Sequence, residues 1–220
     1  KYFHTILVFS PSIESDEKWD YVKERPLLTE NTDLLDWIAK EKAKKKNKSR
    51  IIEEVSAGTE VENLIHKNDA KFTGIIPEEC FFEDYYENEL MKLMEEQRGI
   101  IKVLKKHEQP KYLANRILII FDDLVGSGLF AGSKGSYFKG LNTRRRHYST
   151  SMIMISQGYK EIPKTIRTSW TCLIVFEIGN EKEREVIYEE FPMGLSRKVW
   201  DKAYRYCTDE EHGFMLFFFN

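Results

Sequence analysis

Cysteine is scarce in this chain of 220 residues. Its cysteines are Cys80, Cys172 and Cys207, which are odd in number and far apart in the sequence. This spacing suits neither a disulfide framework nor a tetrahedral zinc site. We therefore expect the protein to occupy a reducing, intracellular compartment.

Long apolar runs and an excess of charge of one sign are also missing. No run approaches the roughly 18 apolar residues of a membrane span and the chain opens without a secretory signal, so we expect a soluble protein with no membrane partner. The 34 basic residues stand against 36 acidic ones, for a net charge of -2. This balance excludes a general attraction to a polyanion, so any contact with nucleic acid must come from a local patch.

The chain does contain several short, almost entirely apolar runs that end at turn residues. Uninterrupted apolar strands are typical of a parallel sheet that is covered on both faces. The predicted strands are residues 5–9, 116–121, 151–155, 171–176 and 213–219.

Helical patterns fill the intervals between these strands. Apolar residues recur at three- and four-residue intervals over residues 83–106, and residues 181–190 and 197–206 also have helical patterns. Strands that alternate with helices indicate an α/β fold built by right-handed crossovers. The length favours a single domain over residues 1–220, in which residues 30–80 form a variable, helical insert.

A basic run at residues 40–50 continues a short helix that we expect to begin near Asp33. A solvated helix end is the ordinary explanation for such a run. The alternative, which we retain, is a loop whose lysines contact the phosphates of DNA. The lysines concerned are Lys44, Lys45, Lys46 and Lys48.

Two acidic residues, Asp122 and Asp123, close the apolar run at residues 116–121. Open α/β sheets bind ligands at the carboxyl ends of their strands. An apolar strand that ends in two acids is the Walker B arrangement, in which Asp122 holds Mg²⁺ on the phosphates of ATP and Asp123 orients or deprotonates the attacking water. Because acids also suit turns, an ordinary strand end explains this motif equally well when it is taken alone.

The next strand ends in a similar way, at Ser156 and Gln157. An amide at this place can touch both the γ-phosphate and the attacking water, which is the role of a sensor. Arg167 follows ten residues later, and its permanently charged guanidinium could reach a nucleotide held by a neighbouring subunit. An ordinary surface arginine is the alternative for Arg167 alone. Two consecutive buried strands that end in Asp-Asp and in Gln are harder to obtain by chance.

Taken together, these motifs resemble those of the genome-packaging ATPases of large DNA viruses, the poxvirus type, and of Polinton-like elements, which are relatives of the HerA/FtsK motors. The matching residues are Phe-Asp-Asp-Leu at 121–124, Arg146-His147, the run 151–157, Ile162-Pro163 and Ile166-Arg167.

This resemblance implies a three-layer, RecA-like P-loop NTPase core with a mainly parallel sheet, and ATP and Mg²⁺ as cofactors. It makes Asp122 the metal-binding acid, Asp123 the catalytic acid, Gln157 the sensor that contacts the nucleotide, and Arg167 the arginine finger. The second acid is often Glu in related motors, and Asp123 has a shorter reach to the water. Arg144, Arg145, Arg146 and His147 could face a nucleotide, a neighbouring subunit or DNA, and we assign them no role.

The sequence departs from this class in its phosphate-binding loop, which requires G-x-x-x-x-G-K-[ST]. None of the 12 glycines is followed by Lys. Lys134 precedes the glycine at 135, so we predict that residues 126–140 form a loop and not a phosphate site. The resemblance places the first strand, the phosphate loop and the first helix before Lys1.

The resemblance also predicts the order of the strands. Residues 152–155 should pair in parallel with residues 117–121, and residues 5–9 should lie on the other side of 117–121. Residues 171–176 should not lie between the strands at 117 and 152, because that strand normally pairs with the strand of the phosphate loop.

The expected function is therefore that of an ATP-driven motor domain that translocates or packages double-stranded DNA. The resemblance implies a homo-oligomeric ring, viral capsid proteins as a further partner, and a place in the cytoplasm or nucleus of a host cell or in the virion. Two alternatives are a helicase-like or transposon-encoded ATPase of the same superfamily and a truncated, non-catalytic remnant.

Overall fold

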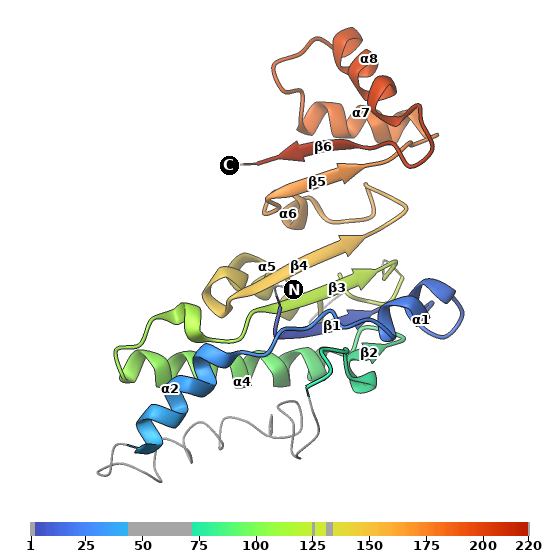
Figure 1. Cartoon of the computed structure of the whole chain (residues 1–220). Helices are drawn as coiled ribbons and strands as arrows, with labels where there is room; N and C mark the ends of the chain where they lie inside the picture. The colour runs from blue at the N-terminus through green and yellow to red at the C-terminus, as the bar shows by residue number, and fades with distance from the viewer. Residues whose placement is uncertain (1–2, 44–71, 125, 131–133, 220) are drawn as a thin grey trace. The chain divides into compact units, whose positions relative to one another are not determined.

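The computed structural model describes residues 3–43, 72–124, 126–130 and 134–219. These residues belong to two compact units, Lys1–Ile155 and Ser156–Asn220. We call them the sheet unit and the C-terminal unit (Figure 1). The basic run with Lys44, Lys45, Lys46 and Lys48 lies outside the described residues.

The sheet unit is built on four parallel strands in the order β2-β1-β3-β4. Strand β1 (Thr5–Phe9) pairs with β3 (Ile117–Asp122), and β3 pairs on its other side with β4 (Thr150–Ile155). Both neighbours of β3 are those that we predicted. The outermost strand, β2 (Phe81–Phe82), is only two residues long and was not predicted.

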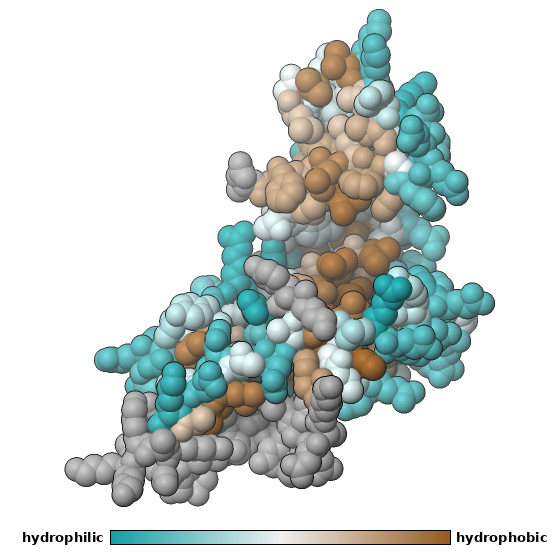
Figure 2. All heavy atoms as spheres, in the orientation of Figure 1, coloured by the Kyte–Doolittle hydropathy of each residue, from teal (hydrophilic) through white to brown (hydrophobic). Residues whose placement is uncertain are grey.

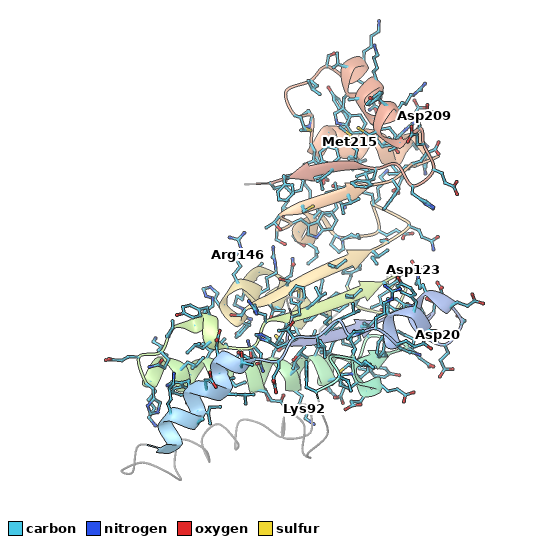
Figure 3. The ribbon with its side chains drawn as sticks, viewed as in Figure 1. Asp20, Lys92, Asp123, Arg146, Asp209 and Met215 are labelled. Carbon is cyan, nitrogen blue, oxygen red and sulfur yellow. The ribbon has the colours of Figure 1, made fainter. Side chains whose placement is uncertain are left out.

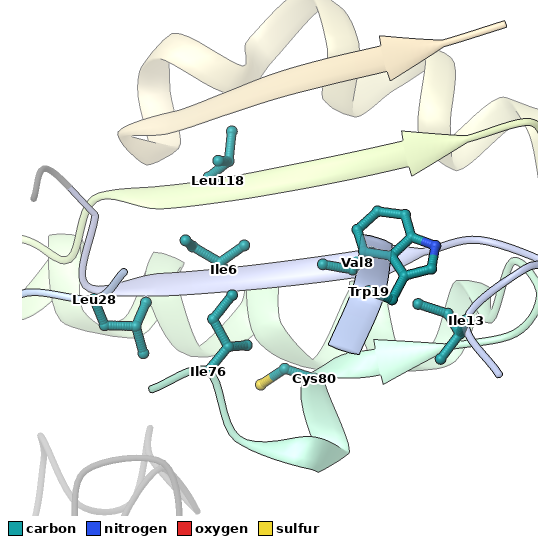
Figure 4. Close-up of a cluster of buried hydrophobic side chains, with 8 residues drawn as sticks. All are labelled: Ile6, Val8, Ile13, Trp19, Leu28, Ile76, Cys80 and Leu118. Carbon is teal, nitrogen blue, oxygen red and sulfur yellow. The ribbon is translucent and has the colours of Figure 1, made fainter. Parts of the chain in front are cut away.

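The central strands β1 and β3 contribute side chains to both faces of the sheet, because successive residues of a strand point in opposite directions. On one face, Val8 and Leu118 pack with Trp19 of α1 (Glu17–Lys23) in a buried cluster shown in Figure 4. On the other face, the rings of Phe9 and Phe121 stack with their centroids 5.4 Å apart. This two-sided burial explains why the two strands are apolar throughout.

Several helices and turns complete the sheet unit. Helix α4 is the long helix predicted at residues 83–106, and it begins four residues later than expected. The short helix expected near Asp33 is α2. The bounds of these elements are α2 (Thr32–Ala43), η2 (Glu78–Cys80), α4 (Glu87–Lys106), η3 (Lys111–Leu113), α5 (Lys134–Arg144) and η4 (Arg145–Tyr148).

The loop predicted at residues 126–140 is wrong in its second half, where α5 begins at Lys134. Glycine disfavours a helix by roughly 1 kcal/mol, which is the basis of that prediction. Two residues three positions apart, Phe138 and Leu141, are almost fully buried in the structure. The Phe138 ring meets the edge of Phe121 at 5.1 Å, so burial of the helix against the sheet outweighs the weak propensity of its sequence.

The C-terminal unit is a separate two-stranded sheet with helices on one face. Strand β5 (Cys172–Val175) pairs in antiparallel fashion with β6 (Met215–Phe218), so the predicted parallel arrangement does not extend to the last strand. Its helices are α6 (Lys164–Arg167), α7 (Glu181–Glu190) and α8 (Arg197–Thr208). Strand β5 also has no place between β3 and β4, as predicted.

The core of the C-terminal unit joins α7 and α8 to one face of the β5–β6 sheet. Val175 and Phe217 pack with Ile187 of α7 and with Trp200 and Tyr204 of α8. The rings of Trp200 and Tyr204 stack at 5.4 Å. Both helices therefore cover the same face.

The opposite face of the β5–β6 sheet is apolar and open to water. Figure 2 shows hydrophobic residues gathered over β5 and β6. The large apolar residues that are at least two-fifths exposed on these strands and their flanks are Ile174, Phe176, Phe214, Leu216 and Phe218.

Taken together, the described residues form a mixed α/β structure with a four-stranded parallel sheet and helices, as in a RecA-like three-layer core. None of the described helices is both long enough and apolar enough to cross a membrane.

Candidate functional site

The predicted metal-binding acid, Asp122, is the last residue of β3 and is 4% exposed. The register of the parallel strands pairs Phe9 of β1 with Phe121 of β3, so the residues that follow, Ser10 and Asp122, also lie next to each other. The Ser10 hydroxyl donates a hydrogen bond of 2.7 Å to Asp122 Oδ2. Ser10 is itself fully buried, which holds the carboxylate in one orientation.

A lysine makes the second described contact with Asp122. Lys18 Nζ lies 3.2 Å from Asp122 Oδ2 and 3.0 Å from Asp16 Oδ2. The pKa of Lys18 is raised, first by its hydrogen bond with Asp16 and also by its bond with Asp122, although partial burial opposes the shift. Asp122 is therefore a buried carboxylate whose negative charge is balanced within the sheet unit.

The second acid, Asp123, lies beyond the end of β3 and is exposed (Figure 3). Its backbone has a positive φ of 51°, a left-handed conformation that Asp tolerates better than most residues. Its N–H donates a 3.0 Å hydrogen bond to the Ile155 carbonyl at the end of β4. The chain thus turns sharply at Asp123 and presents this side chain to solvent at the carboxyl edge of the sheet.

The donor set at this edge fits Mg²⁺. The ion prefers oxygen ligands and is usually held by one or two carboxylates, with water and substrate phosphates completing its octahedron. Asp122 supplies such a carboxylate, and both described hydrogen bonds to it use the same oxygen. No group of three or more His, Cys, Asp or Glu residues suited to a metal is present among the described residues.

Gln157 and Arg167 belong to the C-terminal unit. Gln157 lies two residues beyond the end of β4 and is exposed. Arg167 is the last residue of α6 and is only 7% exposed, which was not expected for a residue that reaches into a neighbouring subunit.

The Arg167 guanidinium is engaged from several sides inside the C-terminal unit. It forms an ion pair with Glu190 of α7, with Nη2 2.5 Å from Oε1 and Nε 3.1 Å from Oε2. It also donates hydrogen bonds to the carbonyl oxygens of Tyr159 and Ile162, and its Cζ lies 4.5 Å from the centre of the Tyr159 ring. These contacts tie the loop before α6 to the end of α7.

The partners of Arg167 have pKa values that match this network. Burial raises the pKa of Glu190, but the hydrogen bonds from Arg167 and Tyr159 outweigh it and lower the pKa below its ordinary value. The pKa of Tyr159 is raised well above its usual range, first by burial and then by its 2.6 Å hydrogen bond to Glu190. Glu190 is therefore an ionised acceptor and Tyr159 a neutral donor at neutral pH.

The four arginine and histidine residues without an assigned role come directly before β4. Arg144 ends α5, and Arg145, Arg146 and His147 lie in η4. This places them at the amino end of β4, whereas Asp122 lies at the carboxyl end of its parallel neighbour β3. They are thus at the opposite edge of the sheet from the two acids.

A described cavity also lies at that opposite edge. It has a volume of about 70 Å³ and is lined by residues such as Thr5, Ile117 and Gln97. Gln97 Oε1 is buried and has no hydrogen-bond partner among the described residues, which suits a cavity that holds water. We place the candidate nucleotide site at the carboxyl edge instead, because open α/β sheets bind their ligands there.

Ser10 and Lys18 were not predicted as residues of the site. Ser10 could have been found from the register, because two adjacent parallel strands that end in Ser and Asp bring those side chains together. Lys18 could not, since its position depends on how α1 folds back onto the sheet.

The sequence of the chain matches the model of a known protein family. The model of the Poxvirus A32 protein family matches residues 65–203, which is more than half of the chain and includes Asp122, Asp123, Gln157 and Arg167. No curated protein sequence matches the chain. The roles of these four residues stay predictions. The match over most of the chain shows that it belongs to the Poxvirus A32 protein family, a family of viral genome-packaging ATPases.

Proposed function

We propose that the chain forms the ATP-hydrolysing core of a motor that moves double-stranded DNA, with Mg²⁺ as the metal. The observation that carries the proposal is the buried carboxylate of Asp122 at the carboxyl end of β3, held by Ser10 and Lys18, in a chain of this family. Bound ATP with Mg²⁺ supplies the phosphoryl group that is transferred to water, and the metal neutralises charge that develops on it.

The chain's own residues then divide the remaining work. Asp122 holds the metal ion, and its burial keeps the carboxylate in a fixed orientation. Asp123, exposed on the adjacent turn, orients the attacking water or accepts its proton. Gln157 acts as the sensor that contacts nucleotide and water. Phosphoryl transfer is catalysed mainly by positioning the reactants and by stabilising charge, and these three residues would do both.

We propose that Arg167 is an arginine finger, which one subunit of a ring extends to the nucleotide of its neighbour. Its contacts set a condition on this role, because the guanidinium must leave Glu190 before it can reach a phosphate. The alternative supported by the same contacts is that Arg167 positions α6 against α7 and touches no nucleotide.

The basic residues Lys44, Lys45, Lys46 and Lys48 are proposed contacts for the DNA backbone, and viral capsid proteins are proposed partners of the motor. We further propose that it works inside the host cell or in the virion. A helicase-like or transposon-encoded ATPase remains the alternative for the cargo, since the motifs concern the nucleotide and not what is moved.

The proposal is tested on a longer protein, in which a phosphate-binding loop that ends in Gly-Lys-Ser or Gly-Lys-Thr is placed before this chain. The quantity measured is its rate of ATP hydrolysis. We expect Asp122→Ala to abolish Mg²⁺-dependent hydrolysis, because it removes the only carboxylate that we place on the metal. Asp20→Ala removes an exposed acid of α1 and is the matched control, with turnover unchanged. Equal turnover in both variants would reject the Walker B assignment and favour a non-catalytic remnant.

A further inference from the structure

Lys18 owes its position to the way in which α1 is anchored. Asp16 caps the helix by accepting a 3.0 Å hydrogen bond from the Lys18 backbone N–H. The next residue, Trp19, is 4% exposed, packs in the cluster with Val8 and Leu118, and donates a hydrogen bond to the Ser12 hydroxyl. Since the helix is held by its cap and by a buried ring, its rotation is fixed and Lys18 is directed to the end of β3.

The ion pair between Lys18 and Asp122 is asymmetric in its exposure. The Asp122 side chain is 6% exposed, whereas the Lys18 side chain is 50% exposed. The member of the pair that meets solvent is therefore Lys18. Lys18 also has a second carboxylate within 3.0 Å, that of Asp16, which is 40% exposed.

Placing a second cation beside this carboxylate costs free energy, because the two cations repel each other. A metal ion bound to Asp122 and an ammonium group 3.2 Å from the same carboxylate would repel each other at short range, where charges near a protein surface interact strongly. The ammonium group has Asp16 as a remaining partner if it moves away. One binding event at Asp122 therefore exchanges one cation for another.

From this geometry we propose that Lys18 is an internal counterion of Asp122 that Mg²⁺ must displace, which makes Lys18 a positioning residue that lowers the affinity of the site for metal. The inference rests on the proposed Mg²⁺ site at Asp122. It adds a residue outside the segment matched by the family. Displacement of Lys18 toward Asp16 also links metal binding to the first turn of α1.

Direct metal binding by the 220-residue chain tests the inference. Mn²⁺ serves as the probe, since free Mn²⁺ can be followed by its electron paramagnetic resonance signal, and Mg²⁺ is then used to compete. We expect Lys18→Met to tighten binding roughly two- to fivefold, the scale of one partly exposed ion pair. Lys18→Gln removes the same charge but keeps a polar end, and it should shift the affinity in the same direction.

Three further variants separate charge from shape and the inference from the site itself. Lys18→Arg keeps the charge and should keep the wild-type affinity. Lys23→Met removes another lysine of α1, whose Nζ contacts the Ile13 carbonyl and the Phe81 ring, and should have no effect. Asp122→Asn should lose the bound metal.

The Lys18 variants test the counterion role, and the Asp122→Asn variant tests the metal site itself. If Lys18→Met and Lys18→Gln bind Mn²⁺ no more tightly than the wild type, the counterion role is wrong while the metal site stands. If Asp122→Asn binds as the wild type does, the metal site of the proposed function is wrong as well, and the role of Lys18 falls with it.

Discussion

At the scale of single residues, the carboxylate of Asp122 and the guanidinium of Arg167 are both buried, but they are compensated differently. Asp122 has one neutral donor, Ser10, and one half-exposed cation, Lys18, whose ammonium group also has Asp16 as a partner. Arg167 and Glu190 are both nearly buried, at 7% and 13% exposure, and satisfy each other. Breaking a buried pair by removing one partner leaves the other uncompensated.

The prediction for Arg167 is a loss of stability. We expect Arg167→Ala to lower the free energy of unfolding of the C-terminal unit by about 3 kcal/mol, because the Glu190 carboxylate would be left buried without its cation. Urea unfolding followed by tryptophan fluorescence measures the change. Arg197→Ala breaks the more exposed pair with Asp201 in the same unit and should cost about 1 kcal/mol or less.

The same pair of variants tests the finger role. If Arg167→Ala keeps the wild-type stability and only reduces ATP turnover, the contacts with Glu190 do not matter to folding and the finger role is favoured. A large loss of stability in Arg167→Ala would assign Arg167 to the packing of α6 against α7.

At the scale of elements, the turn between α8 and β6 depends on a glycine. A Cβ atom on Gly213 would lie 2.6 Å from the Cys207 carbonyl oxygen and 2.9 Å from the Glu210 carbonyl oxygen. Both are backbone atoms and cannot swing away as a side chain can. The close approach of this turn to the end of α8 is what allows β6 to return beside β5.

We therefore predict that Gly213→Ala lowers the stability of the C-terminal unit by roughly 1 to 3 kcal/mol, the cost of overpacking. Gly179→Ala is the matched control, because no atom lies within 4 Å of the added Cβ. Its stability should stay the same or rise slightly, as the unfolded chain loses freedom. Thermal unfolding of both variants decides, and equal melting temperatures would show that the turn adapts.

At the scale of the whole molecule, the sequence contains the acids of the proposed metal site but no G-x-x-x-x-G-K-[ST] motif. The backbone N–H groups and the lysine of G-x-x-x-x-G-K-[ST] supply most of the grip on a nucleotide in this class. The segment closest to it in composition continues into α5 from Lys134. The helix N-terminus there is preceded by residues 131–133, which lie outside the described residues.

The chain as it stands should accordingly bind ATP with Mg²⁺ no more tightly than about 1 mM. Isothermal titration calorimetry with ATP and Mg²⁺ measures this affinity, and ADP serves as a comparison because it lacks the γ-phosphate. A micromolar affinity would mean that the start of α5 binds phosphate after all.

The amino-acid sequence by itself determined the five longer strands of this protein, four of its described helices and the edge at which its acids lie. The continuous apolar runs of β1 and β3 predicted buried parallel strands, and the acids that follow Phe121 had to lie at the carboxyl end of the sheet. These are local features, since the hydrophobic pattern of a strand and the position of its end depend on residues that are adjacent in the sequence. The segment that matches the family includes both acids.

Only the tertiary structure decided which side chains surround those acids. Lys18 reaches Asp122 across 104 positions of the chain because Trp19 is buried against the sheet, and no pattern along the sequence records that contact. The same holds for Arg167, for which the resemblance implied an arginine finger and which pairs with Glu190 of α7 in the folded chain. Contacts between distant segments depend on how elements pack, and packing is a property of the folded chain and not of any short stretch of it.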